Sequence, residues 1–337
     1  MTHATRSSRL RAGWLSLAVG LLVFGGKFGA FLLTGSTAVL SDALESIVNV
    51  AAGALLVFSL IVAARPPDRD HPYGHGKVEF FSAGIEGAFV FGAGGLILFE
   101  AARALLQGPE LQRLGAGLGL LAVFGGVNAL LGLYLVRVGR RTRSAALLAD
   151  GKHVLADVWT TVAVIAGLVA VSLTGWLLLD PLIALAVGLH VLREGYHLVR
   201  DAIGGLMDAA DAEELEALAS ALEKRRAESW IDLHALRAWR SGAFLHADLH
   251  LVIPRYLDAE ALHGIHDEVE AALQDTVGPD SDTVVHFDPC RPPDCPGCPV
   301  ADCPVRSTPF GHRRPFAVEH ATRSDQSVEE QVYLAKV

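Results

Sequence analysis

The sequence predicts an α-helical membrane protein, in which a six-helix transmembrane bundle is followed by a cytosolic α+β domain. Three observations support this fold class. The 337 residues are 51% hydrophobic and 19% charged, with mean hydropathy +0.37, whereas soluble proteins carry about a quarter charged residues. Long apolar stretches fill the first 200 or so positions. After about residue 206, acidic residues and short alternating segments replace them.

Each membrane span requires about 20 mostly apolar residues. The stretches that satisfy this requirement are Gly13–Thr34, Ser36–Ala64, Glu79–Leu106, Gly115–Arg137, Ser144–Thr174 and Leu178–Arg200. We therefore expect a cytosolic N-terminus at 1–12, a transmembrane domain at 13–206, a cytosolic domain at 207–290 and a tail at 291–337.

The orientation follows from the Lys and Arg residues of the short loops, which favour the cytosolic side. One side of the predicted bundle carries Arg6, Arg9, Arg11, Arg65, Arg69, Lys77, Arg137, Arg140, Arg141 and Arg143, and the loops of the other side carry only Arg113. This bias places both termini in the cytosol of a multi-pass protein of the cell (inner) membrane. The net charge of −9 would argue against nucleic-acid binding if it were evenly spread, which it is not, and we expect no nucleic-acid partner.

The cytosolic domain is predicted to run helix, strand, strand, helix, strand. The predicted elements are Asp211–Arg226, Ile231–Trp239, Phe244–Ile253, Asp258–Leu273 and Thr283–Phe287, with a hairpin at Ser241-Gly242. This order predicts a small ferredoxin-like, metallochaperone-like sandwich. From Arg306 onward the sequence mixes charge, Pro and polar residues without periodicity, and we expect disorder there.

Two predicted membrane helices carry ionisable residues, which are expensive in lipid and usually functional. Glu45 and Asn49 are four residues apart in the second helix, and His153 and Asp157 are four apart in the fifth, so each pair shares a helix face. Asp42 and Asp150 lie three residues before each pair. Four such donors could surround one ion. The alternative is that these groups only pair with one another across the bundle.

The motifs that contain these residues resemble those of a known family. Ser36, Ala38, Asp42 and Ala43 of the second helix, and Asp150-x2-His153-x3-Asp157 of the fifth, are similar to signatures of the cation diffusion facilitators, which are proton-coupled exporters of zinc, iron and manganese. The resemblance implies a transport site of Glu45, Asn49, His153 and Asp157. It departs from the family at Asn49, because Asp-Asp or His-Asp is commoner in the second helix.

The resemblance implies an antiporter, not an enzyme, that exports divalent metal from the cytosol in exchange for protons. Zinc is the first expectation, with iron(II), manganese, cobalt and cadmium open, because an Asn oxygen is a weaker zinc ligand than carboxylate or imidazole. Metal binding requires ionised carboxylates and neutral imidazole, so it competes with protons. We expect His153, with Asp157 or Glu45, to carry the returning proton.

The resemblance also covers cytosolic positions. Asp68, His71 and His75 could chelate an ion within one loop, and His71-Pro-Tyr-Gly-His-Gly-Lys77 resembles a family hallmark; the alternative is a solvated polar loop. Several cytosolic domains of the family bind a two-zinc cluster, and the ligands that the resemblance implies here are His234, His250, His263, His286 and Asp288. His246 and His266 are expected to be surface residues. The family is commonly homodimeric, and Lys77 and Asp208 lie where its salt-bridge lock would be.

All four cysteines of the chain lie in Cys290-x4-Cys295-x2-Cys298-x4-Cys303. Thiolates at this spacing can hold one zinc ion tetrahedrally or, less favourably, an iron–sulfur cluster. The alternative is reduced, unligated cysteines in a loose tail. This cluster is not a general feature of the family that the rest of the chain resembles.

Two other classes of function remain open at this stage. A membrane-anchored metal sensor or scaffold would need no ligands at mid-helix depth. A membrane enzyme ranks last because no nucleophile motif, HExxH or P-loop is present.

Overall fold

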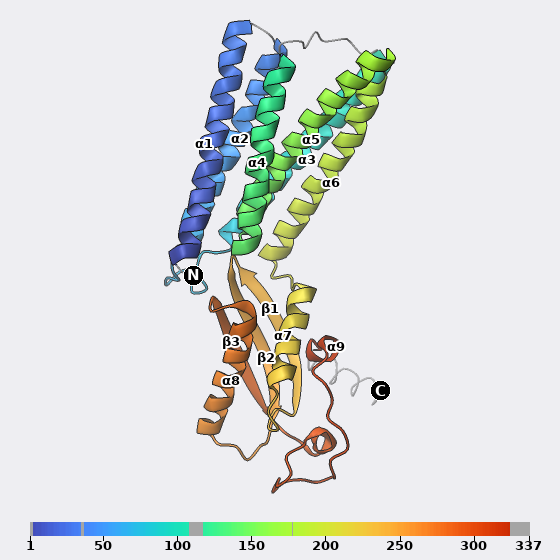
Figure 1. The fold of residues 1–337 in the computed structure, drawn as a ribbon. Helices are drawn as coiled ribbons and strands as arrows, with labels where there is room; N and C mark the ends of the chain where they lie inside the picture. The colour runs from blue at the N-terminus through green and yellow to red at the C-terminus, as the bar shows by residue number, and fades with distance from the viewer. Residues whose placement is uncertain (1–2, 35–36, 108–116, 177, 324–337) are drawn as a thin grey trace. The chain divides into compact units, whose positions relative to one another are not determined.

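The computed structural model describes residues 3–34, 37–107, 117–176 and 178–323 of the chain. Within these residues the chain divides into two compact units, with the division between Met207 and Asp208. Figure 1 shows a first unit of long helices, coloured blue to yellow-green, and a second unit that combines helices with one sheet, coloured yellow to red.

The helices of the first unit match the predicted spans in number and order. Those that the structure describes are α1 (His3–Thr34), α2 (Thr37–Ala63), α3 (Val78–Gln107), α4 (Gly117–Thr142), α5 (Ala145–Thr174) and α6 (Leu179–Leu206). Three of them differ from the prediction, because α1 begins before Gly13, α4 continues past Arg137 and α6 continues past Arg200. Arg is a good helix former and can extend its charged end into water, so a helix need not end where the apolar run ends.

Four described segments are long and apolar enough to cross a membrane: Arg6–Gly29, Val78–Gln107, Ala122–Thr142 and Pro181–Leu206. The described side chains of α2 give a shorter apolar segment, Asn49–Ala63.

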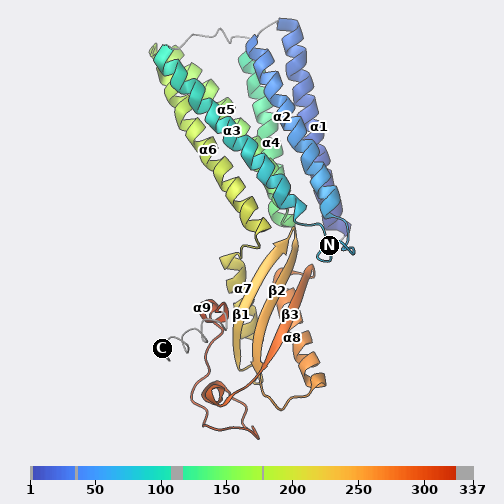
Figure 2. The same cartoon turned by 180° about the vertical axis from the view of Figure 1, so that it is seen from behind.

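Glycine allows α3 and α6 to approach closely; these helices lie side by side in both Figure 1 and Figure 2. A Cβ on Gly94 would lie 2.6 Å from the backbone nitrogen of Leu192, and a Cβ on Gly195 would lie 2.4 Å from that of Phe91. Any side chain at either position would push the helices apart, as expected for small residues at membrane helix interfaces.

The second unit follows the predicted order of elements. It contains α7 (Ala212–Arg225), β1 (Asp232–Ser241), β2 (Phe244–Ile253), α8 (Ala259–Val277) and β3 (Ser281–Pro289). The sheet order is β1-β2-β3, with β1 antiparallel and β3 parallel to β2. The parallel pair requires a crossover, and α8 supplies it. This is the α+β arrangement that the sequence predicts.

Local sequence explains where these elements begin and turn. Asp211 caps α7, since its Oδ1 accepts hydrogen bonds from the backbone N–H groups of Glu213 and Glu214. Asp258 caps α8 in the same way, accepting from Ala261 N at 2.9 Å. The hairpin between β1 and β2 turns at Gly242, whose φ of +65° favours glycine.

Alternation along the strands separates a core face from a second face. In β2, Leu249 and Leu251 are buried in the core beneath the helices, together with Leu218, Val269 and Leu273. His250 lies between those two leucines and therefore points to the opposite face. The sheet thus has one face that forms the core and one that carries histidines.

The segment after β3 differs from the prediction of disorder. A 3₁₀ turn, η1 (Pro292–Gly297), and a short helix, α9 (Val318–Ala321), punctuate a chain that is described as far as Arg323. Phe316 is 3% exposed and Ala321 is fully buried, and both belong to the core of the second unit. Two apolar anchors spaced along a polar segment do not produce the periodicity that a sequence pattern detects.

Candidate metal sites

Three of the four predicted transport-site residues lie together between α2 and α5. The Nε2 atom of His153 lies 2.9 Å from the Oδ1 atom of Asn49, and the Nδ2 atom of Asn49 donates to the Oδ2 atom of Asp157 at 2.7 Å. His153 is 5% exposed. The helical spacing of four residues places His153 and Asp157 on one face of α5, as predicted. The side chains of Asp42 and Glu45 lie outside the described residues.

Asp150 lies in a small polar cavity beside this group. Its side chain is 2% exposed, and its Oδ2 accepts a hydrogen bond of 2.6 Å from Ser16 Oγ of α1. The cavity is also lined by Ser46 and Asn128, besides Asn49 and His153. Ser16, Ser46 and Asn128 were not among the predicted site residues; an amide at Asn128 within an apolar span could have indicated the last of these.

Helix α3 carries buried charges that were not predicted. Glu79 is fully buried and forms an ion pair of 2.7 Å with Arg9 of α1, and it accepts a hydrogen bond from Ser144 at the start of α5. Arg9 also donates to the backbone oxygen of Thr142. These contacts tie α1, α3 and the turn between α4 and α5 together. Glu86, two turns further along α3, is also fully buried.

The loop between α2 and α3 brings Asp68, His71 and His75 together. Their ligand atoms all lie within 4.8 Å of one another, with the His75 Nε2 atom 3.4 Å and the His71 Nδ1 atom 3.2 Å from the Asp68 carboxylate. The backbone N–H of His71, 2.8 Å from Asp68 Oδ1, is the main cause that holds the pKa of Asp68 below its ordinary value. An ionised carboxylate beside two imidazoles is a suitable cation ligand group.

The other metal-ligand group lies in the second unit and forms a row of side chains across the sheet. His234 of β1 lies opposite His250 of β2, and His250 lies opposite His286 of β3. The Asp288 carboxylate reaches all three, at 3.3 Å from His234 Nε2, 3.1 Å from His250 Nδ1 and 3.4 Å from His286 Nε2. His234, His250 and Asp288 have ligand atoms that all lie within 4.8 Å of one another.

The other histidines of this unit differ from the row. His263 is exposed and stacks with His266 on α8, with ring centroids 6.5 Å apart, and in the described residues it does not join the group on the sheet. His246, which the sequence analysis assigned to the surface, is 5% exposed and stacks on Trp239, its cross-strand neighbour. A period-2 pattern does not distinguish a solvated from a covered face.

The cysteines lie around η1, two of them buried and two half-buried. Burial raises the pKa of Cys290, whereas hydrogen bonds from Ser307 lower that of Cys295. Burial raises the pKa of Tyr256, and the nearby thiols Cys303, Cys298 and Cys290 add to the effect. Within the described chain, no three of the sulfur atoms lie all within 4.8 Å of one another.

Lys77 and Asp208 belong to different units, one just before α3 and the other directly after α6. Their predicted role as a dimer lock stays a prediction.

A bundle of membrane helices with buried ligands, joined to a small domain with further ligands, defines the class of membrane proteins that handle metal ions. Comparison with known proteins specifies the class. Residues 13–207 match the family model of the cation efflux transmembrane domain, and residues 210–290 match that of the cation efflux protein, cytoplasmic domain. The chain belongs to the cation diffusion facilitator family, as the sequence motifs indicated.

Individual relatives align over most of their length. An uncharacterized transporter of Synechocystis sp. (sll1263) is 36% identical over 280 residues, which cover 83% of this chain and 90% of that protein. The cation-efflux pumps FieF of Salmonella newport and Salmonella typhimurium are each 28% identical over 294 residues, covering 86% of this chain and 95% of theirs.

The family fixes the general function. The chain is a cation-efflux transporter with transmembrane helices and a cytosolic dimerisation domain, and it is not an enzyme. The expectation of a metal-efflux transporter is therefore confirmed, and the alternatives of a membrane enzyme and of a sensor that transports nothing are set aside.

Proposed function

We propose that this transporter exports a divalent transition metal, zinc in the first place, from the cytosol in exchange for protons. The observation that supports this most is the hydrogen-bonded chain His153–Asn49–Asp157 between α2 and α5. Together with Glu45 these residues offer one imidazole nitrogen and three side-chain oxygens, a donor set suited to a four-coordinate transition-metal ion.

The direction of the hydrogen bonds puts a hydrogen on the His153 nitrogen that faces the site. The amide Nδ2 of Asn49 faces the Asp157 carboxylate, so the amide oxygen is the atom that faces His153. An oxygen can only accept, and the His153 Nε2 atom therefore carries a hydrogen. The Nδ1 atom of His153 is buried without a hydrogen-bond partner among the described residues, which also favours the hydrogen on Nε2.

A metal can bind Nε2 only after the hydrogen there has left. An imidazolium would release it as a proton, whereas a neutral imidazole would only move it to Nδ1. The metal would also replace the amide donor that faces the Asp157 carboxylate. Departure of the metal lets the proton return to His153, with Asp157 or Glu45 as the acid partner. The same residues therefore couple the two ions.

The identity of the metal depends on Asn49. Iron(II), manganese, cobalt and cadmium remain candidates beside zinc, because a neutral amide oxygen is a weaker zinc ligand than a carboxylate or an imidazole. Asp42 and Asp150 are auxiliary acids on the same two helices; the buried Asp150 borders the cavity next to His153.

The same proposal includes orientation and regulation. The positive loops put both termini in the cytosol of the inner membrane. Asp68, His71 and His75 then bind cytosolic metal in the loop, and the row on the sheet binds it in the second unit, with His263 as the fifth ligand that the family resemblance implies. Metal there would favour the homodimer, which Lys77 and Asp208 lock near the membrane surface.

The test is exchange in proteoliposomes loaded with a metal indicator on one side and a pH indicator on the other. The double variant His153→Ala, Asp157→Ala should lose both metal uptake and the opposing proton flux. Transport that persists in this variant would sink the site assignment. Metal uptake without proton flux in the unaltered protein would keep the site and overturn the antiport.

His190→Ala is the matched control. His190 also belongs to a membrane helix, α6, but it is exposed and contacts the edge of Trp159. Its loss should leave both fluxes unchanged, so that an effect of His153 is specific to the position and not to the removal of any membrane histidine.

A further inference from the structure

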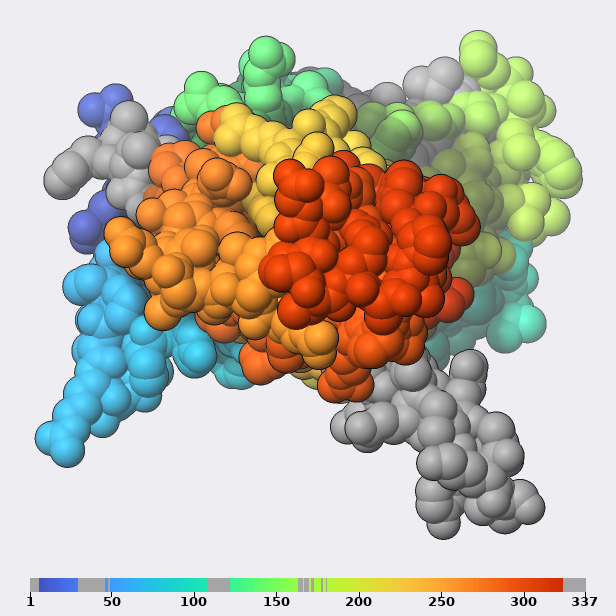
Figure 3. Space-filling model, turned by 90° about the horizontal axis from the view of Figure 1, so that it is seen from below, coloured from blue at the N-terminus to red at the C-terminus, as the bar shows by residue number. Residues whose placement is uncertain are grey.

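The segment between Cys290 and Arg323 is long and has little regular secondary structure. It lies outside the part of the chain that the family models match, which ends at residue 290. Loops of this length in a small domain are uncommon unless they are functional or tied down. In Figure 3 this segment, coloured red, forms a continuous part of the domain surface beside α8 in orange. The structure shows how it is held at both of its ends.

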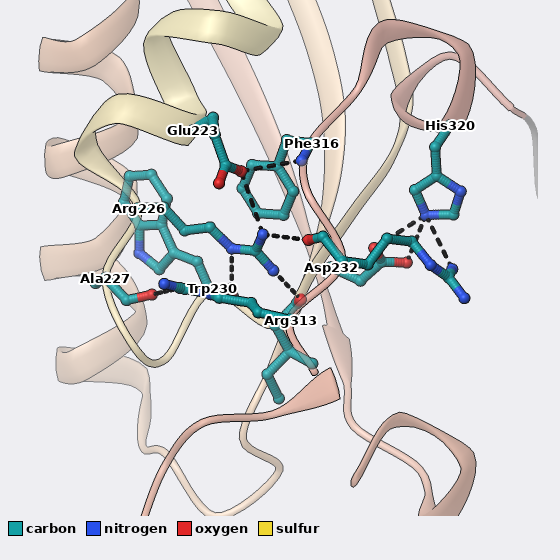
Figure 4. A network of polar contacts seen from close by, with 10 residues as sticks. Glu223, Arg226, Ala227, Trp230, Asp232, Arg313, Phe316 and His320 are labelled. Atoms are coloured by element: carbon teal, nitrogen blue, oxygen red, sulfur yellow. Dashed lines mark hydrogen bonds and ion pairs between the residues drawn. The ribbon is translucent and has the colours of Figure 1, made fainter. Parts of the chain in front are cut away.

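Figure 4 shows how the far end docks on the domain. Arg226 donates to the backbone oxygens of Trp230 at 2.9 Å and of Arg314 at 2.5 Å, and its guanidinium stacks 3.7 Å from the ring centroid of Phe316. The backbone N–H of Phe316 donates to Glu223 Oε2 at 2.9 Å. The far end is thus held by a buried aromatic ring and by charge-assisted hydrogen bonds.

The docked end continues to the edge strand. His320 lies 2.9 Å from the Asp232 carboxylate at the start of β1. The backbone oxygen of Arg323 accepts a 2.8 Å hydrogen bond from Ala235, which lies in the irregularity of β1 next to His234. The segment therefore contacts the strand that carries the first histidine of the row.

The near end is held around the cysteines. Arg306 donates to the backbone oxygens of Cys295 at 3.2 Å, Cys298 at 3.0 Å and Val300 at 2.5 Å. Cys298 packs against Ile231 and Val252, with Cys290 and Val300 beside them. One guanidinium and one small apolar cluster thereby fold the loop so that all four thiols lie around one short turn.

We propose that Cys290, Cys295, Cys298 and Cys303 bind one soft divalent metal ion, zinc by preference, as a structural staple that is separate from the transported ion. Four thiolates are a complete tetrahedral ligand set with Zn–S distances of about 2.3 Å. Arg306 supplies positive charge against the net negative charge of such a centre. Disulfides do not persist in the reducing cytosol, which leaves a metal as the cross-link that this residue pattern can form.

Binding requires the thiols to turn toward a common centre, since the described sulfur atoms are more widely spaced than metal ligands. The turn itself is already built: Cys298 N donates to Cys295 O, and the Ser307 N–H and O–H both donate to the Cys295 sulfur, at 3.5 and 3.4 Å. Donation of N–H and O–H groups to sulfur orients a thiolate ligand. The staple would hold the segment so that its far end stays docked on Arg226 and β1.

The four cysteines are the only ones in the chain, so a thiolate–metal signal from the whole protein reports this site alone. The full-length protein in detergent is loaded with Co²⁺, and the sulfur-to-cobalt charge-transfer band is recorded. We expect the band in the unaltered protein, its displacement by Zn²⁺, and its loss in Cys298→Ser. Absence of the band, or a band unchanged by Cys298→Ser, overturns the site.

Thiol alkylation followed by mass spectrometry provides a second readout. Zn²⁺ should protect all four cysteines of the folded protein, and a chelator should expose them; equal alkylation with and without Zn²⁺ overturns the proposal. Iron with acid-labile sulfide in the purified protein would overturn the divalent-ion assignment. The matched control is His250→Ala, which removes a ligand of the row on the sheet and should leave both the cobalt band and thiol protection unchanged.

The role as a staple is read from trypsin cleavage after Arg313, close to the docked Phe316, because the Arg314–Pro315 bond resists trypsin. Cleavage should be faster in Cys298→Ser than in the unaltered zinc-loaded protein. Phe316→Ala, which removes the anchor but no thiol, should also accelerate cleavage while retaining the cobalt band. Equal cleavage of Cys298→Ser and the unaltered protein would overturn the structural role.

Discussion

The ligand group between α2 and α5 and the row across the sheet both bring metal ligands together, but the first is buried in the bundle and the second is partly exposed. In the bundle, His153 and Asp157 are linked through the amide of Asn49, so that most of their buried polar atoms, though not His153 Nδ1, find partners within the group. On the sheet, Asp288 lies between three histidines whose side chains keep access to water, from 14% exposed at His234 to 64% at His286. A buried polar group without a partner costs about 1–3 kcal/mol, and a solvated one costs little.

Because of this difference, single substitutions should affect the two sites differently. Loss of one group in the bundle exposes its partner to an apolar environment. Loss of one group on the sheet mainly removes a ligand. On a helix, ligands share one face when they are three or four residues apart. Adjacent strands in register can instead place one ligand from every strand in a row.

The largest expected effect comes from breaking a buried charge pair in the bundle. Glu79→Gln would leave the buried Arg9 guanidinium without its carboxylate, which costs about 3–5 kcal/mol. We expect a clearly lowered unfolding midpoint in detergent, and lower yield. Glu100→Gln is the control, because the Glu100–Arg103 pair is more than half exposed at 3.9 Å and contributes little. Equal midpoints for the two variants would break the comparison.

The sequence predicted the arrangement of the fold well for physical reasons. Six apolar stretches and the strand–turn–strand pattern around Gly242 are local signals, and they recovered the helices and the hairpin. Helix ends were less accurate, since α4 continues to Thr142 and α6 to Leu206. The docking of Phe316 was missed because it depends on Arg226 and Glu223, far away in the sequence.

For the candidate sites, residues that share a helix face or a short loop could be predicted from spacing alone. His153 with Asp157, and Asp68 with His71 and His75, are examples. Contacts between distant elements could not, such as Ser16 with Asp150 or Arg9 with Glu79. The row of histidines required the register of both strand pairs, and only the family resemblance pointed to it before the register was known.

On the sheet, His250→Ala removes the middle of the row, whose ring lies 5.1 Å from that of His234 and 4.5 Å from that of His286. We expect the metal affinity of the second unit to fall by roughly 10–100-fold, the range seen even for groups that only support ligands. Stability should change little. Calorimetric titration of Zn²⁺ into the full-length protein, with the membrane site disabled in the background, measures this.

His246→Ala is the control for that titration. It lies on the same strand and the same face as His250, four residues earlier, but it is packed between Trp239 and Phe244 and outside the row. It should lower stability rather than metal affinity. The reverse pattern in these two variants would contradict the assignment of the row.

Between α2 and α5, Asn49→Asp is expected to strengthen metal binding rather than weaken it. A carboxylate at position 49 replaces the amide donor to Asp157, so two like charges face each other until a cation binds. We expect roughly tenfold tighter metal binding, about 1.4 kcal/mol, with the largest gain for zinc. Uptake in proteoliposomes over a metal series measures it. Asn128→Asp, in the same cavity, is the control and should not shift the metal preference.

The smallest expected effect comes from a carboxylate that water already solvates. Asp211→Ala removes the cap of α7, a loss of about 1 kcal/mol, and should accelerate amide exchange in the first turn of that helix by roughly fivefold. Glu216→Gln, exposed in the middle of α7, should change nothing measurable. Asp211 and Glu79 both accept two hydrogen bonds or ion pairs, yet the expected losses differ several-fold. If Asp211→Ala lowered stability as much as Glu79→Gln, burial would not explain the difference between the expected losses.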